Sequence, residues 1–225
     1  MKLFLKHNIY FISIYFILLL KIGYVLLNEG KVQIHKQINA FVGQPFFDIF
    51  FKYVTHIGDG AFSIALAIAI FFVNIKKAMY VLITYLFASL TSTIIKNYIY
   101  LDTCRPSFAF HFYVREPLKL VDGVEMHTFN SFPSGHSTAA FAVFISLMYM
   151  SKNYLVKFLC LLIACLAAYS RTYLSQHWLV DIYFGSIIGF LYATLFYFVF
   201  YNKTTNRSLD NGIIAYFKNR KTVNV

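Results

Sequence analysis

Residues 154–201 read YLVKFLCLLIACLAAYSRTYLSQHWLVDIYFGSIIGFLYATLFYFVFY. Two apolar runs, Tyr154 to Tyr169 and Leu179 to Tyr201, enclose a polar segment that contains Arg171, His177 and Asp181. A membrane-spanning helix needs about 20 mostly apolar residues, so both runs have the composition and approximate length of membrane spans. The stretch therefore predicts two helices that cross a bilayer and carry ionisable side chains at the end where they meet.

The rest of the chain has the same apolar character. Four earlier segments also qualify as spans, some of them loosely: approximately Ile9 to Leu27, Ile57 to Val73, Ala78 to Ile95 and Ser137 to Met150. With 59% hydrophobic and only 13% charged residues, the chain is too apolar for an ordinary water-soluble core. We predict an all-α membrane protein with six transmembrane helices in a bundle. Because no internal repeat or linker is present, residues 1–225 are expected to form a single domain.

The connection between the first two spans contains an amphipathic segment. Gln44 to Tyr53 is rich in Phe, with Asp48 and Lys52 interspersed, which is typical of a helix that lies in the interface of a bilayer. No clear small-residue cleavage site follows the first apolar run, so that run predicts a membrane anchor, with a signal peptide as the alternative.

The net charge of +11 has two explanations, a nucleic-acid partner or basic residues that flank membrane spans. Six spans place the connections alternately on two sides. One side holds eleven Lys or Arg residues, including Lys157 in a turn and Lys218, Arg220 and Lys221 in the tail, against one acid, Asp210; the other holds eight basic and eight acidic residues. The positive-inside rule makes the first side, with both termini, cytoplasmic. Topology thus explains the charge, and no nucleic-acid partner is expected.

His177 and Asp181 stand four residues apart, a spacing that puts two side chains on one face of a helix. A carboxylate there holds one imidazole nitrogen and raises the basicity of the ring, which leaves the other nitrogen free to attack an electrophile. The alternative is an ion pair that caps a helix. Ionisable groups beside a membrane span are costly and tend to be functional, which favours the catalytic interpretation.

The segment Pro133-Ser134-Gly135-His136 precedes the fourth predicted span and is typical of a helix start. We expect Pro133 in the first turn and Gly135 where the backbone closely approaches a ligand. Free amides at a helix N-terminus bind anions, and Ser134 adds a hydroxyl donor. His136 is then placed to act as a general acid on a leaving oxygen, unless the segment is only a capped helix with an exposed histidine.

Three cations reach the same, non-cytoplasmic side from two connections. Lys96 ends the third predicted span, Arg105 precedes Pro106, and Arg171 ends the fifth span. Any one of them alone is explained as an interfacial anchor whose charge reaches the headgroups. Guanidinium groups, however, bind two phosphate oxygens at once. Together with two histidines and an anion-binding helix end, the three cations predict a pocket for a phosphate dianion.

These residues resemble the motifs of the type 2 phosphatidic-acid phosphatase superfamily: a Lys followed by Arg-Pro, then Pro-Ser-Gly-His, then Ser-Arg, five residues, His, three residues and Asp. The second motif matches as Pro133 to His136 and the third as Ser170-Arg171 through His177 to Asp181. The first departs from the family pattern, because eight residues separate Lys96 from Arg105 where six are common. The motifs span residues 96–181, and the hydropathy extends the similarity over nearly the whole chain.

The resemblance implies a helical bundle with a pocket at the ends of its middle spans and a reaction that needs no metal or other cofactor. In this reaction His177 is the nucleophile that forms a phosphohistidine, Asp181 orients it, and His136 is the general acid. Five groups would bind the phosphate and stabilise charge on its oxygens: Lys96, Arg105, Ser134, the Gly135 amide and Arg171. The implied partners are a phosphorylated membrane lipid and the bilayer, with no obligate protein partner.

Three other functions fit part of the pattern. Vanadate-dependent haloperoxidases share the motifs, but those relatives are soluble and six apolar spans disfavour that reading. A metallohydrolase would use His136, His177 and Asp181 as metal ligands, although three neighbouring cations disfavour a divalent ion. A non-catalytic transporter or lipid-binding scaffold would keep the pocket for anion recognition, but it would not need a nucleophile, an orienting acid and a general acid together.

The substrate stays open among lipid A, undecaprenyl diphosphate, phosphatidylglycerol phosphate and phosphatidic acid. In the connection between Arg105 and Ser131, Arg115 or Lys119 is a candidate contact for a second anionic group. The expected location is the inner (cytoplasmic) membrane of a bacterial cell, with the active site facing the periplasm or the cell exterior.

Overall fold

The structure is a computed structural model and describes residues 2–204 and 207–213. All regular elements within these residues are helical, which confirms the predicted all-α class. The main helices are α1 (Lys2–Asn28), α2 (Lys31–Asn39), α3 (Pro45–Val54), α4 (Gly60–Val73), α5 (Ile75–Ile94), α6 (Pro106–Ala109), α7 (Gly135–Met150), α8 (Tyr154–Tyr173) and α9 (Leu179–Phe196). Shorter helical turns are η1 (Thr55–Gly58), η2 (Ile95–Ile99), η3 (Phe110–Val114), η4 (Tyr197–Tyr201) and η5 (Arg207–Asp210).

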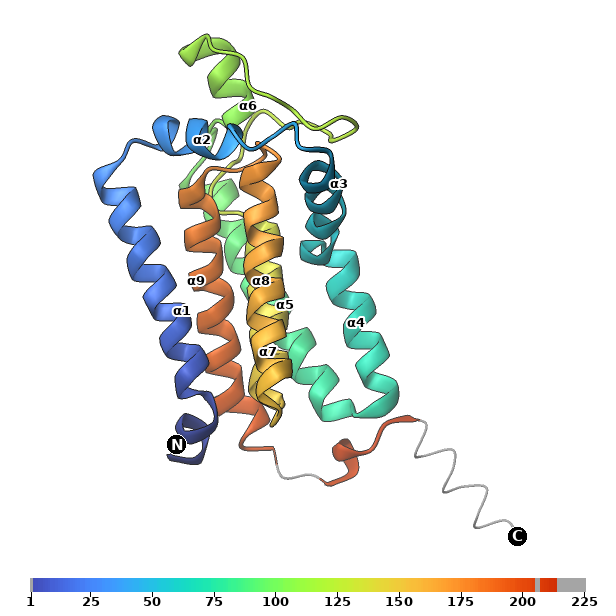
Figure 1. Cartoon of the computed structure of the whole chain (residues 1–225). Coiled ribbons are helices and arrows are strands. Elements are labelled where there is room, and N and C mark those ends of the chain that lie inside the picture. Colours follow the sequence, from blue (N-terminus) through green and yellow to red (C-terminus); the bar gives the residue numbers. More distant parts are fainter. Residues whose placement is uncertain (1, 205–206, 214–225) are drawn as a thin grey trace.

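The long helices run side by side, with the start of α1 and the end of α9 at one end of the bundle and α2 and α6 at the other (Figure 1). Four helices of the described residues are long and apolar enough to cross a membrane: Phe4–Asn28, Ile75–Ile99, Tyr154–Tyr173 and Leu179–Tyr201. A fifth is counted if Pro45–Gly58 and Gly60–Val73, which meet at a bend of 61°, form one broken span.

The structure thus supports four or five spans where the sequence predicted six. The difference lies in two short helices. Helix α4 has 14 residues and α7 has 16, both below the roughly 17 to 25 residues that cross the hydrocarbon core of a bilayer.

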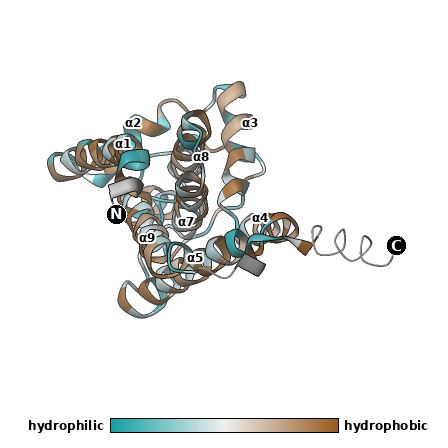
Figure 2. Cartoon of the chain, turned by 90° about the horizontal axis from the view of Figure 1, so that it is seen from below, coloured by the Kyte–Doolittle hydropathy of each residue, from teal (hydrophilic) through white to brown (hydrophobic). Residues whose placement is uncertain are grey.

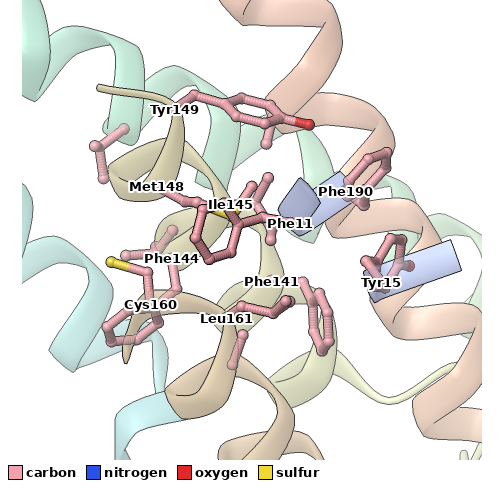
Figure 3. Packing of buried hydrophobic residues seen from close by; sticks show 14 of the residues in the cluster. Phe11, Tyr15, Phe141, Phe144, Ile145, Met148, Tyr149, Cys160, Leu161 and Phe190 are labelled. Atoms are coloured by element: carbon pink, nitrogen blue, oxygen red, sulfur yellow. The ribbon is translucent and has the colours of Figure 1, made fainter. Parts of the chain in front are cut away.

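Helix α7 is the central helix of the bundle. Twelve of its residues are buried, and it packs against α5, α8 and α9. Its Phe141, Ile145 and Met148 join Tyr15 of α1 and Phe190 of α9 in the main hydrophobic cluster (Figure 3). Seen along the bundle, the surrounding helices carry many hydrophobic residues, as expected for a surface in contact with lipid (Figure 2). This enclosure holds the N-terminal residues of α7 in place.

Helices α7 and α9 approach each other closely at two glycines of α9. A Cβ atom on Gly185 would lie 2.7 Å from the Ser134 carbonyl oxygen, and one on Gly189 would lie 2.6 Å from the Thr138 carbonyl oxygen. Glycines four residues apart let helix backbones touch, a common packing device in membranes. The Ser134 amide also donates to the Asp181 carbonyl oxygen at 3.1 Å. The start of α7 is thereby joined to the start of α9.

Helix α3 covers the predicted amphipathic segment and has two distinct sides. Phe46 is 72% exposed, whereas Phe51 is buried. Asp48 accepts a hydrogen bond from the Tyr173 hydroxyl of α8 at 2.5 Å, and Lys52 donates to the Asp122 carbonyl oxygen at 2.6 Å. These contacts attach α3 to the end of the bundle that carries α2 and α6.

Lys157, which the sequence analysis assigned to a cytoplasmic turn, is buried at the start of α8. Its Nζ donates to the side-chain oxygen of Asn8 and to the Met148 carbonyl oxygen at 3.0 Å. A cation at the last carbonyl groups of a helix offsets their partial negative charge. Lys157 therefore connects α1, α7 and α8 instead of lying on the surface. The tail residues Lys218, Arg220 and Lys221 lie outside the described residues.

Candidate active site

His177 and Asp181 lie side by side at the junction of α8 and α9. Both side chains are 2% exposed, and His177 Nδ1 lies 3.3 Å from Asp181 Oδ2. The two residues do not share a helical face as their spacing predicted, because α9 begins at Leu179 with Trp178 as its N-cap. Asp181 Oδ2 instead accepts the Trp178 amide at 2.9 Å. The chain folds over the helix end in this way and brings the imidazole to the carboxylate.

The Asp181 carboxylate sets the tautomer of His177. Ser131 Oγ donates to Asp181 Oδ2 at 2.5 Å, so hydrogen bonds hold the carboxylate on more than one side. A carboxylate accepts a hydrogen bond from the imidazole nitrogen that faces it, which assigns the ring proton to Nδ1 and a lone pair to Nε2. Arg105 Nη1 lies 3.3 Å from that Nε2.

The surroundings of His177 keep its ring neutral. Burial lowers the pKa of His177 well below its ordinary value, and the positive charges of Arg105 and Arg171 lower it further. A neutral imidazole with a free lone pair is a nucleophile, whereas an imidazolium is not. The site therefore holds a neutral imidazole next to cations.

Arg105 is fixed by backbone carbonyl oxygens from two segments. Its Nε donates to the Phe129 carbonyl oxygen at 2.9 Å, and its Nη1 donates to the Gln176 carbonyl oxygen at 3.0 Å. The Trp178 indole nitrogen also donates to the Cys104 carbonyl oxygen at 2.8 Å. The loop before α6 is thus attached to the α8–α9 junction, which places the guanidinium group at His177.

Arg171, near the end of α8, is 5% exposed. Its Nη1 donates to Thr55 Oγ1 of η1 at 2.6 Å. Its Nε is buried and has no hydrogen-bond partner among the described residues. A buried N–H group without an acceptor costs about 1–3 kcal/mol. This guanidinium group therefore offers a donor for an anion.

Lys96 borders a hollow of about 180 Å³ between α4, α5 and α7, which Ser92, Gly135 and His136 also line. Lys96 belongs to η2, a π-helical turn that continues α5. A π-helical turn holds more residues than an α-helical turn, which accommodates part of the long spacing between Lys96 and Arg105. The lysine thus reaches the site despite the departure from the family pattern.

The start of α7 opens onto the same hollow. A Cβ atom on Gly135 would meet nothing within 4 Å, so there is room for a ligand beside the backbone. Amides in the first turn of a helix have no partner within it, and the Ser134 hydroxyl accepts the amide of Ser137 at 3.4 Å. Pro133 lies before the N-cap residue Ser134, and not in the first turn as expected, because α7 begins at Gly135. The helix end has the geometry of an anion site.

His136 has a partner that the motif analysis missed. Its Nε2 lies 2.6 Å from Asp59 Oδ1, and Asp59 Oδ2 lies 2.8 Å from His56 Nδ1. Thr55 at Arg171 and Ser131 at Asp181 were missed in the same way. An acidic residue at the edge of an apolar span was the available signal for Asp59, but its sequence position does not indicate which histidine it contacts.

All eight predicted site residues are at one end of the bundle, and the structure brings them into mutual range. His177 lies within electrostatic range of four other groups: Lys96, Arg105, His136 and Arg171. Asp181 adjoins His177, and Ser134 and Gly135 lie at the α7 start that is joined to α9. This arrangement can bind a tetrahedral anion and attack it with a nitrogen.

Two solved structures resemble this fold. The crystal structure of Aquifex aeolicus LpxE superposes with a TM-score of 0.62 and 22% sequence identity, covering 72% of this chain and 92% of that chain. The crystal structure of the first transmembrane PAP2 type phosphatidylglycerolphosphate phosphatase from Bacillus subtilis superposes with a TM-score of 0.64 and 23% identity, covering 87% of this chain and 98% of that chain. No curated protein sequence matches the chain.

The family model of the PAP2 superfamily matches residues 77–205. This range contains all three motifs, from Lys96 to Asp181, and extends from the start of α5 past the end of α9. The fold, the motifs and this match agree, and the chain belongs to the PAP2 superfamily.

Proposed function

We propose that the protein is a membrane lipid phosphatase that hydrolyses a phosphate monoester or diphosphate of a lipid at the non-cytoplasmic face of its membrane, through a phosphohistidine. The observation that carries this proposal is the arrangement at His177, with Asp181 at one ring nitrogen and Arg105 at the other. A nitrogen nucleophile for a phosphoryl group needs a neutral ring, one tautomer and cations where the phosphate oxygens arrive.

In the first half-reaction, His177 Nε2 attacks phosphorus while the P–O bond to the leaving group breaks. His136 gives a proton to the departing oxygen, so the lipid leaves as an alcohol or, from a diphosphate, as a monophosphate. Asp181 stabilises the positive charge that develops on the His177 ring. The site cations and the amides at the start of α7 stabilise the charge on the phosphoryl oxygens.

In the second half-reaction, water attacks the phosphorus of the phosphohistidine. His136, which is now neutral, takes a proton from that water as the new P–O bond forms. The P–N bond breaks, and its electron pair returns to Nε2 of His177. Inorganic phosphate leaves, and both histidines regain their starting protonation states.

The hollow beside Lys96 supports a substrate whose leaving group carries oxygen atoms. Tyr85, Ser89, Ser92 and Thr93 line it from one face of α5, and none of their hydroxyl groups bonds to another described residue. These hydroxyl groups are therefore free to donate to or accept from a ligand in the hollow. They suit the ester and sugar oxygens of phosphatidylglycerol phosphate, phosphatidic acid or lipid A better than the hydrocarbon chain of undecaprenyl diphosphate.

The two residues considered for a second anionic group differ in their surroundings. Arg115 borders a separate hollow of about 430 Å³ beside α6, together with Ser107 and His111. Lys119 is attached to the end of α2, where its Nζ donates to the Ala40 carbonyl oxygen at 3.4 Å. We therefore retain Arg115 as the candidate for this contact.

The same proposal includes the position in the membrane. Counting α4 and α7 as short spans gives six crossings, with α3 in the interface and both termini in the cytoplasm of a bacterial cell. The start of α1 and the end of α9 share one end of the bundle, opposite the end that carries α2 and α6 (Figure 1). This supports an even number of crossings and a site that faces the periplasm or the cell exterior.

The test measures phosphate release by the purified protein in detergent from the four candidate lipids. We expect release from at least one of them to persist in excess chelator and to be blocked by vanadate. His177→Ala should reduce it by about 10³-fold or more, whereas His127→Ala, at an exposed position, should leave it unchanged. Arg115→Ala should alter the preference between monophosphate and diphosphate lipids.

Each alternative predicts a different result. Release that stops in chelator would indicate a metallohydrolase. A folded protein that binds the lipids and releases no phosphate from any of them would indicate a scaffold or transporter and contradict the proposal.

A further inference from the structure

Asp59 occupies a helix N-cap position, where an aspartate ordinarily bonds to its own helix, but its side chain contacts two histidines instead. It is the N-cap residue of α4, and its side chain makes no capping hydrogen bond. An aspartate at an N-cap normally accepts an amide of the first turn and stabilises the helix. Here Oδ1 lies 2.6 Å from His136 Nε2, and Oδ2 lies 2.8 Å from His56 Nδ1. The carboxylate bridges two imidazole rings and leaves its own helix uncapped.

The backbone next to Asp59 is packed directly onto His136. A Cβ atom on Gly58 would lie 2.9 Å from both the Cβ and the carbonyl oxygen of His136, a separation that only glycine permits. In the same segment, Thr55 accepts the hydrogen bond from Arg171. Residues 55–59 thus contact two groups of the active site from a part of the chain that the family model, over residues 77–205, does not match.

We propose that Asp59 is a positioning residue for the general acid. It binds His136 through Nε2, so that Nδ1 is the nitrogen that exchanges a proton with the leaving oxygen and later with water. His56 in turn contacts the other carboxylate oxygen of Asp59 and helps to orient it. The proposal rests on the phosphatase function proposed above. A carboxylate hydrogen-bonded to an imidazole selects its tautomer and stabilises the imidazolium form, which is the form that can donate.

The proton balance of this arrangement is simple. In the first half-reaction the Nδ1 proton of His136 passes to the leaving oxygen as the P–O bond breaks, and the ring stays bonded to Asp59 through its Nε2 proton. In the second, Nδ1 takes a proton from the attacking water as the P–N bond of the phosphohistidine breaks. Asp59 neither gains nor loses a proton, which is why its role is to orient and not to react.

The charges around His136 explain why a carboxylate is needed there. Arg171 and Lys96 lie within electrostatic range of His136, and both carry positive charge. A third positive charge on the imidazole would be disfavoured among them without a compensating anion. Asp59 supplies that anion to His136, and Asp181 supplies one to His177.

The test compares two substrates that differ in their need for an acid. A lipid alkoxide leaves only when it is protonated, whereas p-nitrophenolate leaves without protonation. The full-length protein is mixed in single turnovers with p-nitrophenyl phosphate and with dioctanoyl phosphatidic acid, or with another of the four candidate lipids if that one is cleaved faster. Phosphohistidine formation is then followed over time.

Asp59→Asn should slow the lipid reaction by about 10- to 100-fold and the aryl reaction by less than about 3-fold. Asp59→Glu, which keeps the carboxylate, should recover part of the lipid rate. Asp48→Asn is the matched control, because this carboxylate contacts Tyr173 and no site histidine. It should change neither rate, and thermal unfolding in detergent checks that each variant is folded.

Equal slowing of both substrates, or no slowing of either, by Asp59→Asn would overturn the positioning role. If that variant does not fold, His56→Ala, at a side chain that is 67% exposed, carries the test: selective slowing of the lipid supports the role, and equal or absent slowing contradicts it. Wild-type protein that forms no phosphohistidine would instead overturn the proposed function.

Discussion

Burial and the neighbouring positive charges both lower the pKa of His177. An imidazolium would add a positive charge to a buried region that already holds Arg105 and Arg171, so its pKa is lowered and the neutral ring is favoured. The same cations attract a phosphate dianion. In the proposed reaction, one set of residues therefore binds the substrate and keeps the nucleophile unprotonated.

The pH dependence of phosphohistidine formation follows from this. His177 attacks only when it is neutral, so the rate falls as the pH drops through its pKa, and burial has moved that pKa below the ordinary value near 6.5. We expect the rate from p-nitrophenyl phosphate to be near its plateau at pH 6.5 and to fall only at lower pH. A rate that is half-maximal at or above pH 6.5, measured in single turnovers, would contradict this assignment.

Between elements, the contact of α7 with α9 matters most for the site. The glycines of α9 allow the backbones to touch where Ser134 bonds to Asp181. This contact joins the helix that carries His136 to the helix that carries Asp181. The packing of two helices therefore sets the separation of His136 and His177, the proposed general acid and nucleophile.

Gly189→Ala should disturb this contact. The added Cβ would lie 2.6 Å from backbone atoms of α7, which cannot move as a side-chain end can, and overpacking of this kind costs about 1–3 kcal/mol. We expect a lower thermal unfolding midpoint in detergent and reduced phosphate release. Gly30→Ala is the control, because a Cβ there meets nothing within 4 Å. Equal stability of the two variants would show that α7 and α9 are not in close contact.

For the whole molecule, the bundle has one end that carries the candidate site and another that carries the basic turns. Lys76, in the first turn of α5, and Lys152, between α7 and α8, belong to the end where α1 starts and α9 finishes (Figure 1). Arg105 and His177 lie at the opposite end. This separation is the basis of the proposed orientation, with the site end outside the cytoplasm and the basic end inside it.

Cysteine labelling tests this orientation. In a Cys104→Ala background, Glu116→Cys introduces an exposed thiol at the site end, and Lys152→Cys introduces one at the other end. We expect a membrane-impermeant maleimide to label the first in intact spheroplasts and the second only after the membrane is permeabilised, because the reagent cannot cross the bilayer. The background variant, whose Cys160 is buried, serves as the control. Labelling in the reverse order would place the site in the cytoplasm.

The sequence alone determined the helical class, the membrane character and the candidate residues of the motifs. These are local properties, since hydropathy is read over about 20 residues and a motif over a few. The predicted fourth span, for example, began at Ser137, and α7 begins two residues earlier at Gly135. The predicted count of six spans differs from the four or five in the structure because α4 and α7 are short. The length of an apolar run does not show whether lipid or protein surrounds it.

Only the tertiary structure decided which side chains meet. Asp59 contacts His136, Thr55 contacts Arg171 across 116 positions, and Ser131 contacts Asp181 across 50. No spacing rule covers such distances, because the facing of two helices depends on apolar burial summed over the bundle and on close approaches such as that at Gly58. The chain specifies what each helix presents, and the packing of all of them determines what each side chain contacts.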